Sequence, residues 1–351
     1  MRACGCPATG RDRRGPAFLL AALTACAPGS ADEDAATGAR TLTLGVYTTP
    51  REVYAAVQPG FSAAWQARTG APVTFRDSYL GSGAQSRAIA GGFEADVAAL
   101  SLEPDIARLV DAGLVAATWK QGAHGGMVSR SIVVLGVRTG NPLGVRDWDD
   151  LARAGVEVLT PNPRTSGGAM WNIAALYGAA LRGHTGAPAG DTAAADRLLR
   201  RVLANVSVMD KGARESMLTF EAGVGDVIIT YENEIIAAQR AGRAVEYVIP
   251  RSTILIENPA VVVDRYAAAH GNTEVASAFV AWLVSDDVQR VFAAHGYRPV
   301  SDAVAVAVAD RFPPVADLFT IRDLGDWSAA VPALFGAGGA FDRATARVAS
   351  Q

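Results

Sequence analysis

Short apolar runs alternate with longer segments of helical periodicity along most of the chain. The runs at 41–46 and 132–137 have the length of strands, and the second is continuously apolar, as in a strand buried on both faces. Residues 51–68 carry apolar positions at helical spacing behind Pro50, a residue suited to the start of a helix. This alternation is typical of an α/β fold with largely parallel sheets.

The remaining segments extend the same order to residue 295. Further strands are expected at 73–76, 95–100, 156–159, 206–209, 227–230, 254–256 and 261–263. Helices are expected at 106–114, at 169–181, from about residue 213, after residue 230, and as a pair within 272–295 joined near Asp286. Ligands of parallel sheets bind beyond the carboxyl ends of strands, where helices begin, so the loops at those positions form the candidate site.

The first 40 residues have a different character. A basic stretch at 11–14 precedes an apolar run at 18–23, which is too short to span a bilayer, and Cys26 follows in the sequence LTAC. This order resembles the signal segment of a bacterial lipoprotein, in which cleavage leaves a lipidated Cys26. We therefore expect a signal peptide at 1–25 and a flexible tether at 26–40. The alternative is a plain secretory signal with an incidental cysteine.

Composition narrows the function. The 351 residues suffice for two domains, and half of them are hydrophobic. A formal net charge of −3 gives no general attraction to nucleic acid or to an anionic membrane, so the lipid is the only expected membrane contact. An anion site would have to be built locally. Cleavage would leave Cys26 as the only cysteine, and the four histidines form no metal-ligand pattern, so neither a metal nor a cofactor is expected.

Two loops between an expected strand and an expected helix are rich in Gly and Ser. The loop at 81–83 (GSG) starts a helix, whose unpaired N–H groups and partial positive charge favour anions. Taken alone, this loop fits an ordinary serine N-cap with glycines for turning better than a ligand site. The loop at 160–169 places Ser166 at an N-cap and Gly167 and Gly168 in the first helical turn. Two glycines there lower helix stability, which favours a ligand-binding role.

Two weaker candidates follow. Gly212 and Ala213 precede a helix and expose N–H groups with little side-chain bulk. Tyr231 follows an expected strand, and its hydroxyl could donate to a ligand, although a tyrosine packed in the core would read the same way.

A resemblance joins these loops. It covers nearly all of the chain after the tether and is carried by YTTPREVY at 47–54, GSG at 81–83, EADV at 94–97, RTGNPLGVRDW at 138–148, TPNPRTSGGAMWN at 160–172, GAR at 212–214, YENE at 231–234 and GYRP at 296–299. On these stretches the chain resembles the bacterial sulfate- and thiosulfate-binding proteins of ABC importers.

The resemblance implies a monomer with a two-lobed periplasmic-binding-protein-like fold of type II and its ligand in the cleft. Lobe one would comprise 41–132 and 253–351, and lobe two 133–252. The protein would be anchored by lipid to the cell membrane, facing the periplasm or the extracellular space. It would capture sulfate, or thiosulfate, and deliver it to the permease subunits of the importer.

The resemblance also implies a site made of neutral donors. These are the N–H groups of Thr48, Ser82, Gly167, Gly168 and Ala213 and the hydroxyls of Ser166 and Tyr231. Thr48 stands where the family often has Asp, and Tyr231 where its enteric members have Trp, so the anion selectivity stays open. None of these positions carries a carboxylate to accept the proton of phosphate, which predicts that phosphate is rejected.

Other functions remain as alternatives. The chain could bind another tetrahedral oxyanion, such as molybdate or tungstate, because loop sequence does not measure the size of a site. An enzyme acting on sulfate or phosphate esters would need a nucleophile with a base, or a metal, and no such pattern stands out. A lipoprotein that senses or scaffolds is the third alternative.

Overall fold

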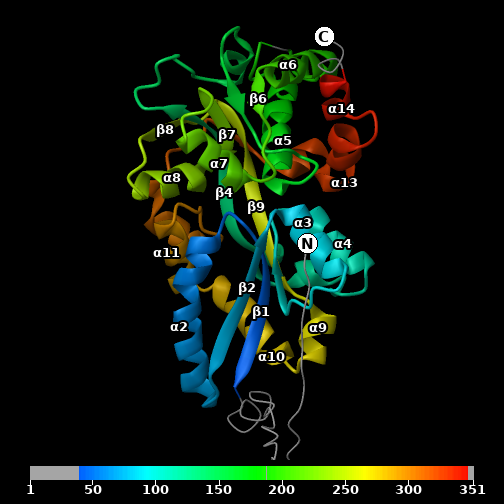
Figure 1. Cartoon of the computed structure of the whole chain (residues 1–351), viewed down its shortest axis with the longest axis vertical. Coiled ribbons are helices and arrows are strands. Elements are labelled where there is room, and N and C mark those ends of the chain that lie inside the picture. Colours follow the sequence, from blue (N-terminus) through cyan, green and yellow to red (C-terminus); the bar gives the residue numbers. More distant parts are fainter. Residues whose placement is uncertain (1–38, 187, 347–351) are drawn as a thin grey trace, which may run out of the picture.

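The computed structural model describes residues 39–186 and 188–346, which form two lobes stacked along the long axis of the molecule (Figure 1). Two long antiparallel strands, β4 (Met127–Arg138) and β9 (Ser252–Val262), run from one lobe into the other. They pair with each other from Met127↔Pro259 to Ile132↔Leu255. The lobes are therefore connected through continuous strands.

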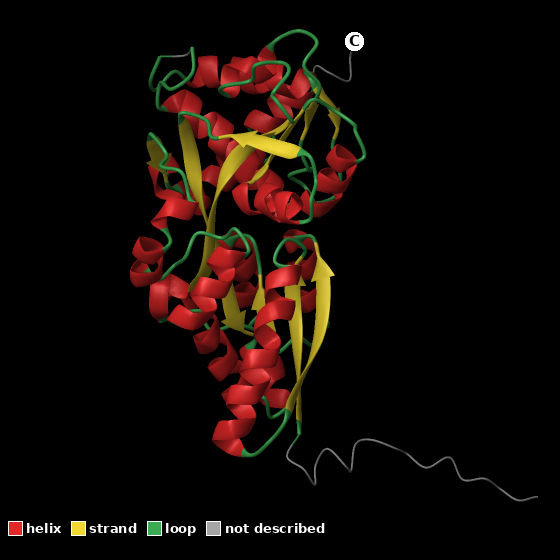
Figure 2. Ribbon diagram, turned by 90° about the vertical axis from the view of Figure 1, so that its left-hand side faces the viewer, coloured by secondary structure: helices red, strands yellow, loops and turns green. Residues whose placement is uncertain are grey.

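Lobe one lies around the carboxyl end of β9 and the start of β4. Its strands β1 (Arg40–Tyr47), β2 (Val73–Leu80) and β3 (Val97–Ala99) are parallel to one another, and β3 pairs antiparallel with β9. Its helices are α2 (Arg51–Thr69), α3 (Ser82–Ala90), α4 (Glu103–Asp111), α9 (Asp264–Ala269), α10 (Thr273–Leu283), α11 (Asp286–Ala294) and α12 (Asp302–Ala307). The ribbon turned by 90° shows these helices packed beside the strands (Figure 2).

Lobe two is built on the other end of the two long strands. Its parallel strands are β5 (Val158–Leu159), β6 (Val206–Val208) and β7 (Val227–Tyr231), and β8 (Val245–Val248) pairs antiparallel with β4. Its helices are α5 (Gly167–Leu181), α6 (Thr192–Ala204), α7 (Ala213–Glu221) and α8 (Glu232–Arg240). Helix α5 is apolar on nearly every side because it is buried at the centre of this lobe.

The end of the described chain packs on lobe two. Strand β10 (Asp317–Phe319) pairs in parallel with the start of β9, and helices α13 (Asp326–Ala330) and α14 (Ala340–Thr345) lie beside α5 and α6. Arg343 on α14 pairs with Asp196 on α6 at 2.8 Å. The expectation that 253–351 falls wholly within lobe one therefore differs from this packing, because the segment from 317 onward shares a core with lobe two.

The expected α/β fold is confirmed, and its elements mostly match the hydrophobic pattern. The separate strands expected at 254–256 and 261–263 are one strand, β9. The expected signal peptide at 1–25, Cys26 and nearly all of the tether lie outside the described residues. Within the described ranges, each helix is too short or too polar to cross a bilayer.

Candidate functional site

Helix starts from the two lobes meet at the waist of the molecule, where α3 faces α5 and α7 (Figure 1). A Cβ added to Gly81, just before α3, would lie 3.0 Å from the carbonyl oxygen of Thr165, just before α5. Thr165 in turn donates from Oγ1 to the carbonyl of Lys211, just before α7, at 2.7 Å. The three loops that sequence analysis selected separately are therefore neighbours in space.

The start of α5 forms the lobe-two side of this junction. Ser166 is the N-cap residue, is almost completely buried, and accepts from the Ala169 N–H at 3.4 Å. A Cβ added to Gly168 would lie 3.3 Å from the Ala213 Cβ and 3.6 Å from the Tyr231 ring. One small region is thus bordered by Ser166, Gly168, Ala213 and Tyr231.

Ser82 occupies the facing position in lobe one, at the first residue of α3. Its buried hydroxyl donates to Asp105 Oδ2 at 2.6 Å and accepts from the Ser101 N–H at 2.8 Å. Gln85 supplies the first backbone N–H of α3 that bonds within the helix, to Gly81 O. The N–H groups of the preceding turn, including that of Ser82, lack intrahelical acceptors and suit an anion.

Thr48 follows the carboxyl end of β1 and is half-buried. The carbonyl of its neighbour Thr49 accepts from Arg214 Nη2 at 3.3 Å, and Arg214 is the residue after Ala213. The loop of Thr48 is thereby held at the start of α7. Among the described residues, no hydrogen bond joins Thr48 itself to another of the candidate residues.

Tyr231 ends β7, and its hydroxyl lies 2.8 Å from the Oγ of Ser101 in lobe one. Burial raises the pKa of Tyr231 well above its usual value, so the phenol stays neutral and keeps its proton for a hydrogen bond. Ser101 also accepts at its carbonyl from the Trp171 indole N–H at 2.9 Å. The sequence does not single out Ser101, because a serine between two leucines (LSLE, 100–103) belongs to no recognisable motif.

Charged groups near the junction are already paired. Asp105 bonds Arg108 at 2.9 Å, and Arg214 bonds Glu52 at 2.8 Å across the lobes. Arg214 also lies 3.5 Å from Glu234, and burial raises the pKa of Glu234 to about 7. The two arginines Arg108 and Arg214 therefore already have carboxylate partners, so an anion at the junction would be balanced mainly by the N–H dipoles of the helix starts.

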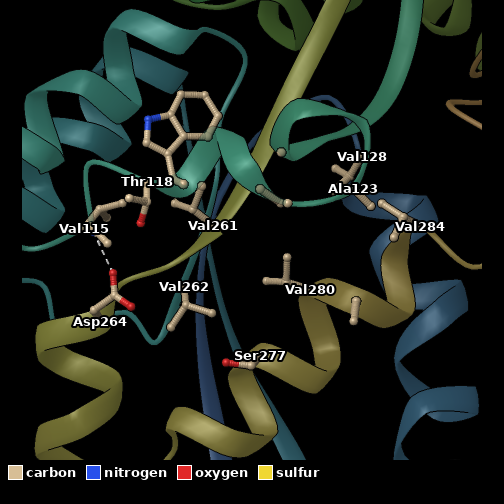
Figure 3. A pocket seen from close by; sticks show the side chains of 16 residues that line it. Val115, Thr118, Ala123, Val128, Val261, Val262, Asp264, Ser277, Val280 and Val284 are labelled. Atoms are coloured by element: carbon tan, nitrogen blue, oxygen red, sulfur yellow. Dashed lines mark hydrogen bonds between the residues drawn. The ribbon is translucent and has the colours of Figure 1, made fainter.

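A separate hollow of about 380 Å³ lies within lobe one (Figure 3). Val115, Val261 and Val280 line it, and its carboxylate, Asp264, is engaged by the Ala116 N–H at 2.7 Å. Apolar walls do not offset the hydration that a dianion would lose there. This hollow is therefore not the candidate anion site.

Metal-binding side chains are not gathered by the fold. Across the described residues, His, Cys, Asp and Glu form no group of three or more that could hold a metal ion. His270 lies between Asp96 at 2.8 Å and Glu94 at 3.1 Å, and these carboxylates raise its pKa against the opposing effect of burial. Its contacts are those of a structural ion pair.

Known proteins place the chain in a family. The family model described as bacterial extracellular solute-binding protein matches residues 42–298. The sulfate-binding protein of Synechococcus elongatus is 40% identical over 312 residues, which is 88% of each chain. The thiosulfate-binding protein of Escherichia coli is 34% identical over 85% of this chain and 88% of its own length.

A solved structure agrees with these sequence relatives. The sulfate-binding protein SubI from Mycobacterium tuberculosis is 41% identical, with a TM-score of 0.78, and the match covers 84% of this chain and 99% of SubI. The periplasmic binding protein P5PA shares the fold alone, with a TM-score of 0.62 and 19% identity. The resemblance stated from the sequence is confirmed, and the chain belongs to the family of bacterial extracellular solute-binding proteins.

Proposed function

We propose that this protein captures sulfate outside the cytoplasm and delivers it to the permease of an ABC importer. Relatives that cover most of the chain are named sulfate-binding proteins, and the solved neighbour at 41% identity is one as well. The observation that carries the proposal is the meeting of the starts of α3, α5 and α7, from both lobes, at a buried point lined by neutral donors.

The donor set suits a fully ionised oxyanion. The proposed donors are the N–H groups of Thr48, Ser82, Gly167, Gly168 and Ala213, with the hydroxyls of Ser166 and Tyr231. Three helix starts add their partial positive charges, and the paired cations nearby leave the anion to these dipoles. Because sulfate carries no proton at neutral pH, it accepts from every donor without a mismatch.

Phosphate differs from sulfate in keeping a proton near pH 7. That proton would face another donor, because Asp105, the carboxylate bonded to the first residue of α3, already accepts from Ser82 and Arg108. Such a mismatch costs roughly 2–5 kcal/mol, on the scale of a buried polar group left unpaired. The proposed site therefore rejects protonated oxyanions.

The proposal also covers attachment to the membrane through a lipid on Cys26 and a role in binding, without catalysis. The basic, apolar and LTAC order before residue 27 supports a lipid on Cys26, with the protein facing the periplasm or the extracellular space. The relatives are named for binding and not for catalysis, which supports a carrier that binds and releases its anion unchanged. Exchange with the permease would then depend on opening and closing of the lobes.

Calorimetric titration of the purified protein with sulfate, thiosulfate, molybdate and phosphate tests the proposal. We expect micromolar or tighter binding of sulfate and no heat from phosphate. Heat from thiosulfate or molybdate in place of sulfate would keep the site and change the cargo. Silence for all four anions would contradict the proposed function.

A further inference from the structure

Ser101 lies where the helix starts of the two lobes meet. It follows β3 in lobe one, and its N–H donates to Ser82 Oγ at the start of α3 at 2.8 Å. A Cβ added to Gly167, the first residue of α5, would lie 2.9 Å from Ser101 Oγ. The hydroxyl of Ser101 is therefore held between the two helix starts to which the proposed function assigns the anion.

One of the two hydroxyl protons of Ser101 and Tyr231 has no acceptor in the described part of the protein. Ser101 Oγ and the Tyr231 hydroxyl are 2.8 Å apart, and each carries one proton, so one proton lies between them and the other needs an acceptor. In the described part of the chain, neither hydroxyl has another acceptor within hydrogen-bond distance: the side chain of Asn258 also hydrogen-bonds the Tyr231 oxygen, but it does so as a donor, because its Oδ1 accepts from Ser129. Both residues are about 1% exposed, so water in contact with the bulk does not supply one.

The relative acidity of the two hydroxyls determines which of them donates to the other and which keeps the proton that has no acceptor. A phenol is more acidic than an alkyl alcohol, so it is the stronger donor, and the oxygen of serine is the better acceptor. The arrangement in which Tyr231 donates to Ser101 is therefore favoured. Asn258 adds a further constraint, since its amide donates to the Ser101 carbonyl at 3.0 Å and holds the Ser101 backbone in place.

We propose that Ser101 donates directly to the bound oxyanion and that Tyr231 is a positioning residue that donates to Ser101 from behind. This inference rests on the proposed function and revises the direct donation expected of Tyr231. It also bears on specificity. Because Ser101 Oγ accepts from Tyr231, the Ser101 hydroxyl faces the anion as a donor. The proton of a protonated oxyanion therefore finds no acceptor at Ser101.

Two variants separate this arrangement from direct donation by Tyr231. Ser101→Ala removes a hydrogen bond to a charged group, so we expect the Kd for sulfate to rise about tenfold to a hundredfold. Tyr231→Phe leaves the Ser101 hydroxyl in place, so the loss of sulfate affinity is smaller. It also frees a lone pair on Ser101 Oγ, so the preference for sulfate over hydrogenarsenate or hydrogenphosphate narrows. A purely structural role of Tyr231 would not change that preference.

The matched control is Ser131→Ala, another fully buried serine, whose hydroxyl has no partner. It should bind sulfate like the wild type. Calorimetry gives each Kd, and thermal unfolding without anion reports whether each variant folds. Should Ser101→Ala fail to fold, the anion preference of Tyr231→Phe decides the question alone.

Three results would overturn the proposal: unchanged sulfate binding by Ser101→Ala, a larger loss in Tyr231→Phe than in Ser101→Ala, or an unchanged anion preference in Tyr231→Phe. A wild type that binds no sulfate would instead contradict the proposed function. The same variants would then be compared with the oxyanion that the wild type does bind.

Discussion

Gly167 shows how one missing side chain sets the contact between the lobes. An added Cβ would lie 2.9 Å from Ser101 Oγ and 3.0 Å from both Ser101 Cβ and Leu102 Cγ. All these atoms belong to lobe one, whereas Gly167 starts α5 in lobe two. A side chain at this position therefore opposes closure of the lobes more than it opposes folding of either lobe.

Gly167→Ala should weaken sulfate binding and leave the fold intact. Overpacking costs about 1–3 kcal/mol, which corresponds to a rise in Kd of about fivefold to 150-fold when it acts only on the closed form. The unfolding free energy of the anion-free protein should stay within about 0.5 kcal/mol of the wild type. Calorimetry and urea unfolding measure the two quantities, and a loss of stability without a loss of affinity would contradict this view.

At this scale, the sequence predicts residues whose type is unusual for their position. Gly167 and Gly168 were identifiable because glycines are costly in the first turn of a helix. Ser101 was not, because a serine after a short strand is common and its role depends on Ser82, Trp171 and Tyr231, which are distant in sequence. The sequence singles out Tyr231 because it follows a buried strand, but it does not single out Ser101, which lies within hydrogen-bond distance of the Tyr231 hydroxyl.

At the scale of elements, periodicity located α2, α5 and most of the buried strands to within a few residues, but it gave no helix at 192–204, where α6 lies. It did not identify β10, because three residues carry too little pattern and pairing with β9 is a tertiary contact. The position of 317–346 on lobe two depends on that pairing and on contacts such as Gly178 with Phe319. A division into lobes by chain order therefore fails at this end.

Gly178 measures how closely β10 packs on α5. An added Cβ would lie 2.4 Å from the Phe319 ring. Overpacking of about 1–3 kcal/mol outweighs the gain of up to about 1 kcal/mol from placing alanine in a helix, so Gly178→Ala should lower the unfolding free energy. Urea denaturation measures the change.

The control for both glycine substitutions is Gly60→Ala, inside α2, where an added Cβ would make ordinary contact with Trp282 at 3.5 Å. It should keep or slightly raise stability and leave the Kd for sulfate unchanged. Gly178→Ala should likewise bind sulfate with near wild-type affinity, because Phe319 is packed within lobe two and away from the helix starts. A Gly178→Ala protein as stable as Gly60→Ala would show that this packing is loose.

At the scale of the whole molecule, several specific bonds join the lobes. One is a buried ion pair, in which Arg298 of lobe one donates to both carboxylate oxygens of Glu232, the first residue of α8 in lobe two, at 2.7 and 2.9 Å. Ser101 accepts from Trp171 and pairs with Tyr231, and Glu52 pairs with Arg214 at the surface. Glu52 is about half exposed, so its ion pair contributes at most about 1 kcal/mol.

Closure without an anion also has an electrostatic cost. It brings the starts of α3, α5 and α7 together, and their partial positive charges repel one another until a dianion lies between them. We therefore expect the anion-free protein to be open, by bending of β4 and β9, and the sulfate-bound protein to be closed as in this structure.

Small-angle X-ray scattering should show a smaller radius of gyration with sulfate than with chloride at equal ionic strength, and Gly167→Ala should reduce the difference at limiting sulfate. If the radius of gyration in chloride already matches that of the sulfate-bound form, the bonds between the lobes outweigh the repulsion of the helix starts, and sulfate binds to a closed site.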